Sequence, residues 1–118
     1  MLDVKENGIL LQIIKRCNRI IEKTSNISQN DFSLNDDIKE VVCFNLFQIG
    51  ELANGLSIDF IKRFNKIPWK QIIGMRNRIV HGYDTINFEI VWNTAMDSIP
   101  ELMDYCKHII IYNSKENS

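Results

Sequence analysis

Apolar residues recur at the spacing of an α-helix along most of this chain, and this periodicity limits the possible folds more than any other feature. The first segment places apolar residues at the i, i+3, i+4 and i+7 positions of an amphipathic helix, which we expect near residues 3–23. These apolar residues are Leu10, Ile13, Ile14, Cys17, Ile20 and Ile21. No segment shows the alternation with period two that marks a half-buried strand. The sequence therefore predicts an all-helical protein.

Local signals place the next two helices. Ser33 is followed three residues later by Asp36, which is a helix-start pattern, and apolar residues then keep helical spacing over residues 34–54. The polar stretch at residues 24–35 has no periodicity and is expected to be a loop. A short helix is expected at residues 58–64.

The second half of the chain predicts two more helices. Pro68 presets φ for a first helical turn, and Gly82 stands where a left-handed cap would end that helix, which makes His81 a last-turn residue. Asn87 is expected to cap the final helix, which runs nearly to the end of the sequence. Pro100 should kink or divide it, because proline interrupts the helical hydrogen bonds.

The length of the chain bounds its organisation. A sequence of 118 residues, 45% of them apolar, is enough for one core, so we expect a single domain over residues 1–118. The helices favour an antiparallel bundle with about four main members. No apolar run reaches the roughly 18 residues that cross a bilayer, and acids stand where a signal peptide would be basic, so we expect a cytoplasmic protein with no membrane contact.

Cysteine and histidine usage argues against a disulfide or metal framework. Cys17, Cys43 and Cys106 lie far apart among apolar neighbours and are expected to be buried free thiols. The two histidines, His81 and His108, are also far apart, and one histidine without nearby carboxylates cannot build a catalytic zinc site. We therefore expect neither a metal ion nor a cofactor.

Charge is distributed unevenly along a chain whose formal net charge is only −1. Residues 60–83 contain six basic residues and no Asp or Glu, whereas residues 31–59 contain six acids and one lysine. The basic residues are Lys62, Arg63, Lys66, Lys70, Arg76 and Arg78. A basic stretch on an otherwise acidic chain marks a place where a phosphate can bind, although a solvated helix face would look the same.

His81 and Arg76 are the residues of this basic stretch best suited to chemistry. Histidine is the side chain suited to proton transfer near neutral pH, so His81 is a candidate general acid or base, and the Arg76 guanidinium can clamp a phosphate. Five residues on one helix place the two side chains about 140° apart, so they do not share a face. Either the helix loosens before His81, or a second copy of the chain completes the site.

The missing motifs narrow the reaction. The sequence has no nucleophile elbow and no glycine-rich phosphate loop. What remains is chemistry that the substrate largely performs on itself. RNA fits, because its 2′-hydroxyl attacks the adjacent phosphorus once a histidine takes the proton and an arginine stabilises the phosphate.

These residues also form a recognisable pattern. The signature of HepT-like proteins in the HEPN superfamily is an Arg, four residues, a His, one residue and a Tyr, and it resembles PWKQIIGMRNRIVHGYDTINFEIVWN in this chain. Arg76, His81 and Tyr83 fill the three places. The resemblance extends upstream to FQIGELANGLS, with its Gly-Glu pair, and downstream through Trp92 and residues 99–102.

The resemblance implies a dimeric helical ribonuclease that needs no metal and acts as the toxin of a toxin–antitoxin pair. Its partner would be a minimal nucleotidyltransferase antitoxin that silences the toxin by attaching AMP to Tyr83. Asn77 matches a position that is usually polar in the family, so we assign it a supporting role. Lys70 and Arg78 are our candidates for RNA binding.

Two other functions are compatible with the sequence. In the first alternative, the chain is a non-catalytic HEPN module that binds a nucleotide or docks a nucleotidyltransferase. This alternative stays open because binding a phosphate and cleaving it require similar residues. A plain helical interaction protein is the third possibility, and the complete set of Arg76, His81 and Tyr83 disfavours it. We favour the ribonuclease.

Overall fold

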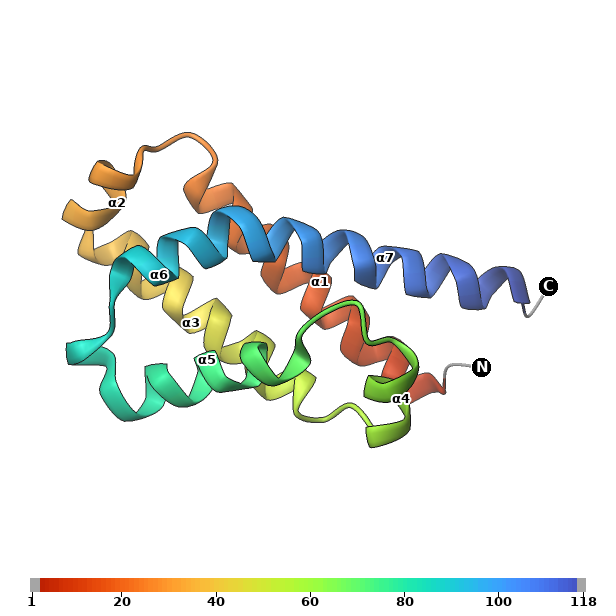
Figure 1. Ribbon diagram of the computed structural model, residues 1–118. Helices are drawn as coiled ribbons and strands as arrows, with labels where there is room; N and C mark the ends of the chain where they lie inside the picture. The colour runs from red at the N-terminus through yellow and green to blue at the C-terminus, as the bar shows by residue number, and fades with distance from the viewer. Residues whose placement is uncertain (1–2, 117–118) are drawn as a thin grey trace.

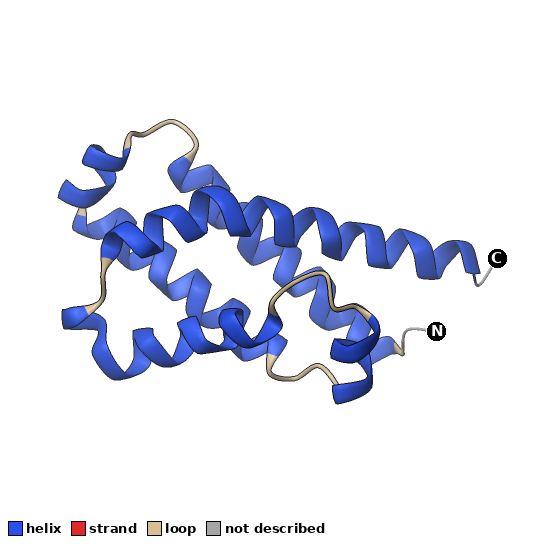
Figure 2. Cartoon of the chain, in the orientation of Figure 1, coloured by secondary structure: helices blue, strands red, loops and turns tan. Residues whose placement is uncertain are grey.

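The computed structural model describes residues 3–116, which form seven α-helices and two shorter helical turns, with no strand in this range (Figures 1 and 2). The elements are α1 (Val4–Thr24), α2 (Gln29–Leu34), α3 (Asp36–Ala53), α4 (Ile58–Arg63), α5 (Trp69–Gly82), the 3-10 turn η1 (Tyr83–Thr85), α6 (Phe88–Asn93), the π-helical turn η2 (Thr94–Ser98) and α7 (Ile99–Glu116). Four of the helices are long, and the expected all-helical fold is confirmed.

Helix α3 lies at the centre of the bundle, packed against α1 on one side and α5 on the other. Helix α7 packs on α1, and α6 leads into it from the η1 end of α5 (Figure 1). The core between these helices is built from aliphatic side chains such as Leu10, Ile13, Val42 and Leu102, all nearly inaccessible to solvent. Because α5 rests on α3, the residues that contact it from α3 determine where its side chains point.

Helix α2 corrects the expectation of a loop at residues 24–35. Ser28 accepts a hydrogen bond from the Asp31 backbone N–H, and Asp31 accepts one from the Ser28 backbone N–H, which forms a capping box. The aromatic ring of Phe32 is buried and packs on Trp92 with the ring centroids 5.2 Å apart. Phe32 is the one buried residue of this six-residue helix, and a single buried apolar position leaves no periodicity to detect.

The start of α3 also differs from the expectation. Asn35, rather than Ser33, is the N-cap, and its side chain accepts a hydrogen bond from the Ile38 backbone N–H at 3.0 Å. The Ser33 hydroxyl instead donates to the Asn30 carbonyl inside α2. The predicted helix at residues 34–54 therefore begins two residues later, at Asp36.

The interruption expected at Pro100 is confirmed, and it takes the form of a π-helical turn. Pro100 has no N–H, so the turn before it cannot close with the usual hydrogen bonds. The chain widens over Thr94–Ser98, and the Ile99 N–H donates to the Thr94 carbonyl five residues back. Asn87 caps α6 as expected, accepting a hydrogen bond from the Glu89 N–H.

The three cysteines are buried and free, as predicted. Burial raises the pKa of the Cys43 thiol to about 11 and that of Cys106 to about 12, and it raises the pKa of Cys17 further. Thiols with raised pKa values are poor nucleophiles at neutral pH, so these residues contribute packing rather than chemistry.

Candidate active site

Helix α5 and the turn that follows it carry the predicted site residues. Arg76, Asn77 and His81 lie on α5, with His81 in its last turn, and Tyr83 begins η1. The left-handed cap expected at Gly82 is wrong, because Gly82 is the last residue of α5 and has a φ of −158°. The chain instead tightens into η1, where the Thr85 hydroxyl donates to the Gly82 carbonyl at 3.1 Å.

Arg76 points toward α3 and is partly buried there. A Glu51 carboxylate oxygen lies 2.5 Å from the Arg76 Nε atom, in an ion pair that joins the two helices. Beside it, a side chain on Gly50 would overlap the Arg76 Cβ atom and lie 3.3 Å from the Ile72 carbonyl oxygen. Gly50 therefore allows α5 to approach α3, and Glu51 fixes the direction of the arginine that arrives there.

Neither Gly50 nor Glu51 was among the candidate site residues, although the Gly-Glu pair was part of the resemblance. A glycine inside a helix lowers stability relative to alanine, so Gly50 in the predicted helix was a signal that another part of the chain approaches there. What the sequence lacked was the pairing of α3 with α5, because the contact joins residues far apart in the chain.

His81 is exposed and lines a pocket of about 330 Å³ at the end of α5. Arg78, one turn earlier on the same helix, lines this pocket too, and the α5–α6 connection supplies Thr85 and Asn87 on the other side. The lining does not include Arg76, which agrees with the angle of about 140° expected between the two residues. In one copy of the chain, His81 is therefore beside Arg78, and Arg76 is beside Glu51.

Tyr83 is partly buried at the start of η1. Its ring packs edge-on against Phe88, with the two ring centroids 5.8 Å apart. The Lys39 ammonium lies over the Phe88 ring, 4.6 Å from the ring centroid. Desolvation raises the pKa of the Tyr83 hydroxyl, and electrostatic interactions with Cys43, Glu40, Asp36 and Asp84 raise it further. The hydroxyl therefore stays protonated at neutral pH.

The remaining predicted residues are on the surface of α5. Lys70, Asn77 and Arg78 are all exposed, and Lys70 and Arg78 both line a groove of about 510 Å³ beside the helix. His108 is exposed on α7, where its Nδ1 atom lies 2.8 Å from the Asp104 carbonyl oxygen, as expected for an ordinary surface histidine.

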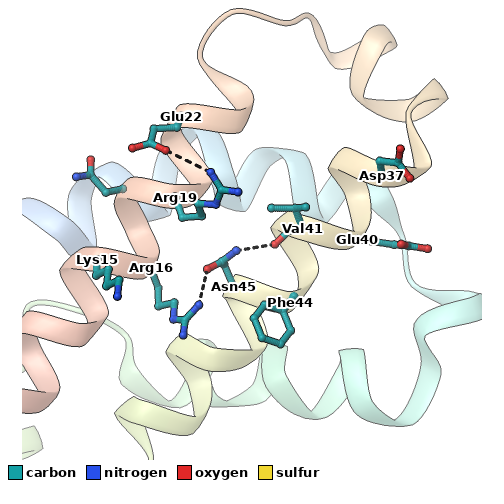
Figure 3. A pocket seen from close by; sticks show the side chains of 10 residues that line it. Lys15, Arg16, Arg19, Glu22, Asp37, Glu40, Val41, Phe44 and Asn45 are labelled. Carbon is teal, nitrogen blue, oxygen red and sulfur yellow. Dashed lines mark hydrogen bonds and ion pairs between the residues drawn. The ribbon is translucent and has the colours of Figure 1, made fainter.

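A further hollow, of about 770 Å³ and separate from the pocket of His81 and the groove beside α5, lies between α1 and α3 (Figure 3). Two of its arginines are engaged by neighbours: Arg16 with the Asn45 Oδ1 atom at 3.4 Å and Arg19 with Glu22 at 3.6 Å. Arg16 also lies over the Phe44 ring, and carboxylates from both helices line the same space. Because both of its arginines are engaged by neighbours and its charge is mixed, this hollow is less suited to phosphate than the end of α5.

Among the described side chains, those of residues 3–114, no three His, Cys, Asp or Glu lie close enough together to hold a metal ion. In the same range, no helix is both long and apolar enough to cross a membrane.

Comparison with known proteins identifies the family. The profile described as "Ribonuclease HepT-like" matches residues 13–109, which is most of the chain. The chain belongs to the HepT-like ribonuclease family of the HEPN superfamily. This confirms the resemblance carried by Arg76, His81 and Tyr83, whereas the roles of these residues stay predictions.

Curated relatives of this HepT-like protein carry ribonuclease names. A "Putative RNase" of Caldanaerobacter subterraneus subsp. tengcongensis is 35% identical over 101 residues, which cover 86% of this chain and 90% of the relative. A "Putative RNase" of Methanocaldococcus jannaschii is 33% identical over 118 residues, covering 98% and 96%. The "Probable ribonuclease HepT" of Thermococcus cleftensis is 30% identical over 83 residues, covering 70% and 76%. No solved structure matches the chain significantly.

Proposed function

We propose that this HepT-like protein is a metal-independent endoribonuclease, that it acts as the toxin of a toxin–antitoxin pair, and that Arg76 and His81 are its catalytic residues. The observation that carries the proposal is the position of His81, exposed in the last turn of α5 and lining an open pocket beside Arg78. Histidine is the side chain best suited to proton transfer near neutral pH. Membership of a ribonuclease family supports the reaction class.

The reaction needs two proton transfers and no added reagent. A histidine takes the proton of the 2′-hydroxyl, the O2′–P bond forms, and the P–O5′ bond breaks. An imidazolium returns a proton to the departing 5′-oxygen, so the products are a 2′,3′-cyclic phosphate and a 5′-hydroxyl. Arg76 stabilises the negative charge on the five-coordinate phosphorus. This electrostatic stabilisation is strongest where water is excluded.

A second copy of the chain supplies what one copy does not bring together. Arg76 and His81 point to different sides of α5, so we infer a two-fold homodimer in which the motifs of both chains face one cleft. One imidazole then acts as the base while the partner's imidazole acts as the acid. Asn77 is exposed four residues before His81, on the same face of α5, where its amide donates to the phosphate.

The regulation that we propose is adenylylation of Tyr83 by a minimal nucleotidyltransferase antitoxin. Tyr83 is two residues from His81, and its surroundings hold the carboxylates of Asp36 and Glu40. A phosphodiester on the hydroxyl is repelled by these carboxylates and is directed toward the cations of α5, where RNA would otherwise bind. Because the pKa of Tyr83 is raised, the antitoxin has to supply the base that removes the phenol proton.

The decisive experiment compares the two histidines. Purified protein is incubated with single-stranded RNA in excess chelator, and His81→Ala is measured beside His108→Ala, which removes an exposed histidine from α7. We expect cleavage by the wild type and by His108→Ala, products with a 2′,3′-cyclic phosphate, and no cleavage by His81→Ala. Tight RNA binding without any cleavage by the wild type would favour the non-catalytic module instead.

Silencing has a test of its own. Incubation with the partner nucleotidyltransferase, ATP and magnesium should add AMP to Tyr83, as mapped by mass spectrometry, and should abolish cleavage. Tyr105, on α7, is the internal control that should stay unmodified. Modification elsewhere, or full cleavage by the modified protein, contradicts the proposed regulation while leaving the ribonuclease proposal intact.

A further inference from the structure

The groove of about 510 Å³ is lined by α5 on one side and by η2 and the start of α7 on the other. Helix α3 supplies an apolar floor with Leu46 and Ile49, and α7 adds Ile99. The groove continues into the pocket of His81, because Met75, Arg78 and Ile90 line both. A ligand in the groove therefore lies next to the pocket of the candidate catalytic histidine.

The edge of the groove on α5 is basic. Lys70 and Arg78 are exposed there, two helical turns and about 12 Å apart along the axis, and His81 follows one turn later. The opposite wall is polar, with the hydroxyls of Thr94 and Ser98 and the carboxylate of Glu101. An apolar floor with cations on one edge and hydrogen-bonding groups on the other is suited to a flat base attached to a charged backbone.

Gly74 keeps this groove open. It lies between Lys70 and Arg78 on the same face of α5, and a Cβ atom added to it would meet nothing within 4 Å. A glycine inside a helix lowers its stability relative to alanine, and here no neighbouring atom requires the small residue. This contrasts with Gly50, where a neighbouring helix explains the glycine. The space that a side chain would occupy at Gly74 is available to a ligand.

We infer that the groove binds one unstacked base of single-stranded RNA next to the phosphate that His81 cleaves, an inference that rests on the proposed ribonuclease function. Lys70 and Arg78 hold the backbone phosphates on either side of the base, which lies over the apolar floor. Thr94, Ser98 and Glu101 face the edge of the base, and a carboxylate there accepts hydrogen bonds from an exocyclic amino group. Duplex RNA is excluded, because its bases are stacked and paired.

The test measures RNA binding rather than cleavage, so that it stays separate from the proposed function. In the His81→Ala background, Gly74→Leu fills the groove with a good helix former, and Gly8→Leu makes the same exchange at an open, exposed site on α1. Fluorescence anisotropy with a labelled eight-nucleotide single strand should show at least a tenfold weaker affinity for Gly74→Leu and no change for Gly8→Leu. An abasic strand of the same length should bind both variants equally weakly.

Amide shift mapping gives a second readout that does not depend on the Gly74 variant folding. Titration of folded His81→Ala with the single strand should shift the amides of Gly74, Ser98 and Ile99, and the duplex of the same sequence should not. Equal RNA affinity for both glycine variants, or shifts confined to other helices, overturns the inference. So does a Gly74→Leu protein that binds RNA normally but no longer associates with the partner nucleotidyltransferase, because the groove would then be a protein-docking site. If the wild type binds RNA in the groove and does not cleave it, base binding in the groove stands, whereas the ribonuclease proposal and the placing of a cleaved phosphate beside His81 fail.

Discussion

Replacing Gly50 by alanine tests whether the contact between α3 and α5 sets the position of Arg76. The new methyl group would overlap the Arg76 Cβ atom and lie 3.3 Å from both the Arg76 Cγ atom and the Ile72 carbonyl oxygen. Ordinary carbon contacts are about 3.5–4.0 Å, so α5 has to move by about 1 Å. We expect the variant to fold, to lose stability and to cleave RNA about 100-fold more slowly, because a displacement of this size spoils a positioned catalytic group.

The matched control for the stability change of Gly50→Ala is Gly8→Ala, where the added methyl group meets open space. Both exchanges gain about 1 kcal/mol of helix propensity. The difference between the two variants is therefore the overpacking cost alone, about 1–3 kcal/mol in the free energy of unfolding. For a domain of this size, that corresponds to a difference in Tm of about 4–12 °C.

Thermal and urea unfolding followed by circular dichroism would measure this difference, and RNA cleavage would be assayed on the same preparations. Gly8→Ala should be as active as the wild type. If Gly50→Ala gains as much stability as Gly8→Ala and keeps full activity, α3 and α5 do not approach as closely as the structure shows, and the reasoning about Arg76 is wrong.

Three further predictions follow from the ion pair, the buried thiols and the placement of the motif. Glu51→Gln should lower kcat with little change in KM, because Arg76 loses the carboxylate that orients it. The free energy of unfolding should change by less than about 1 kcal/mol. The control is Glu22→Gln, which breaks an ion pair remote from α5 and should change neither kcat nor KM. Stability should fall above pH 9, because burial raises the pKa of all three thiols on folding and an unfolded chain loses these protons first. The contribution of Cys43, whose pKa rises from 9.0 to about 11, is complete below pH 9 and is lost toward pH 11, so Cys43→Ala should make this slope shallower while Cys17 and Cys106 maintain the rest of it. Mixed dimers of Arg76→Ala and His81→Ala chains should not recover cleavage activity, because the proposed reaction uses the imidazoles of both chains and such a dimer has one. Partial recovery would mean that one Arg76 and one His81 from opposite chains suffice, and a monomer by light scattering at micromolar concentration would rule out the shared cleft itself.

The long helices were predictable because their apolar residues repeat many times, whereas α2 was not. Its six residues bury one side chain, Phe32, so the hydrophobic pattern carried no period, and the Ser28–Asp31 capping box was the remaining signal. Gly82 misled for a related reason. A left-handed cap and a 3-10 turn both follow glycine readily, and the choice depends on the later residue Thr85, whose hydroxyl bonds to the Gly82 carbonyl.

For the candidate site, the sequence placed residues on one helix but not between helices. The angle between Arg76 and His81 follows from helix geometry alone, and the structure agrees with it. The partners of Arg76 lie on α3, more than 20 residues earlier in the chain, and no local pattern indicates which face of α3 meets α5. Long-range packing therefore had to be seen before Gly50 and Glu51 could be given a role.

The number of residues in the π-helical turn at Thr94–Ser98 sets the orientation of α7 about its own axis. It contains one more residue than an α-helical path would need, and that residue sets the rotational phase of everything after it. Removing it would turn α7 by about 100°, which carries Leu102, Cys106 and Ile109 away from the core that they now fill. The packing of α7 therefore constrains the number of residues in this turn, because an insertion or deletion within it would move the apolar face of α7 out of the core.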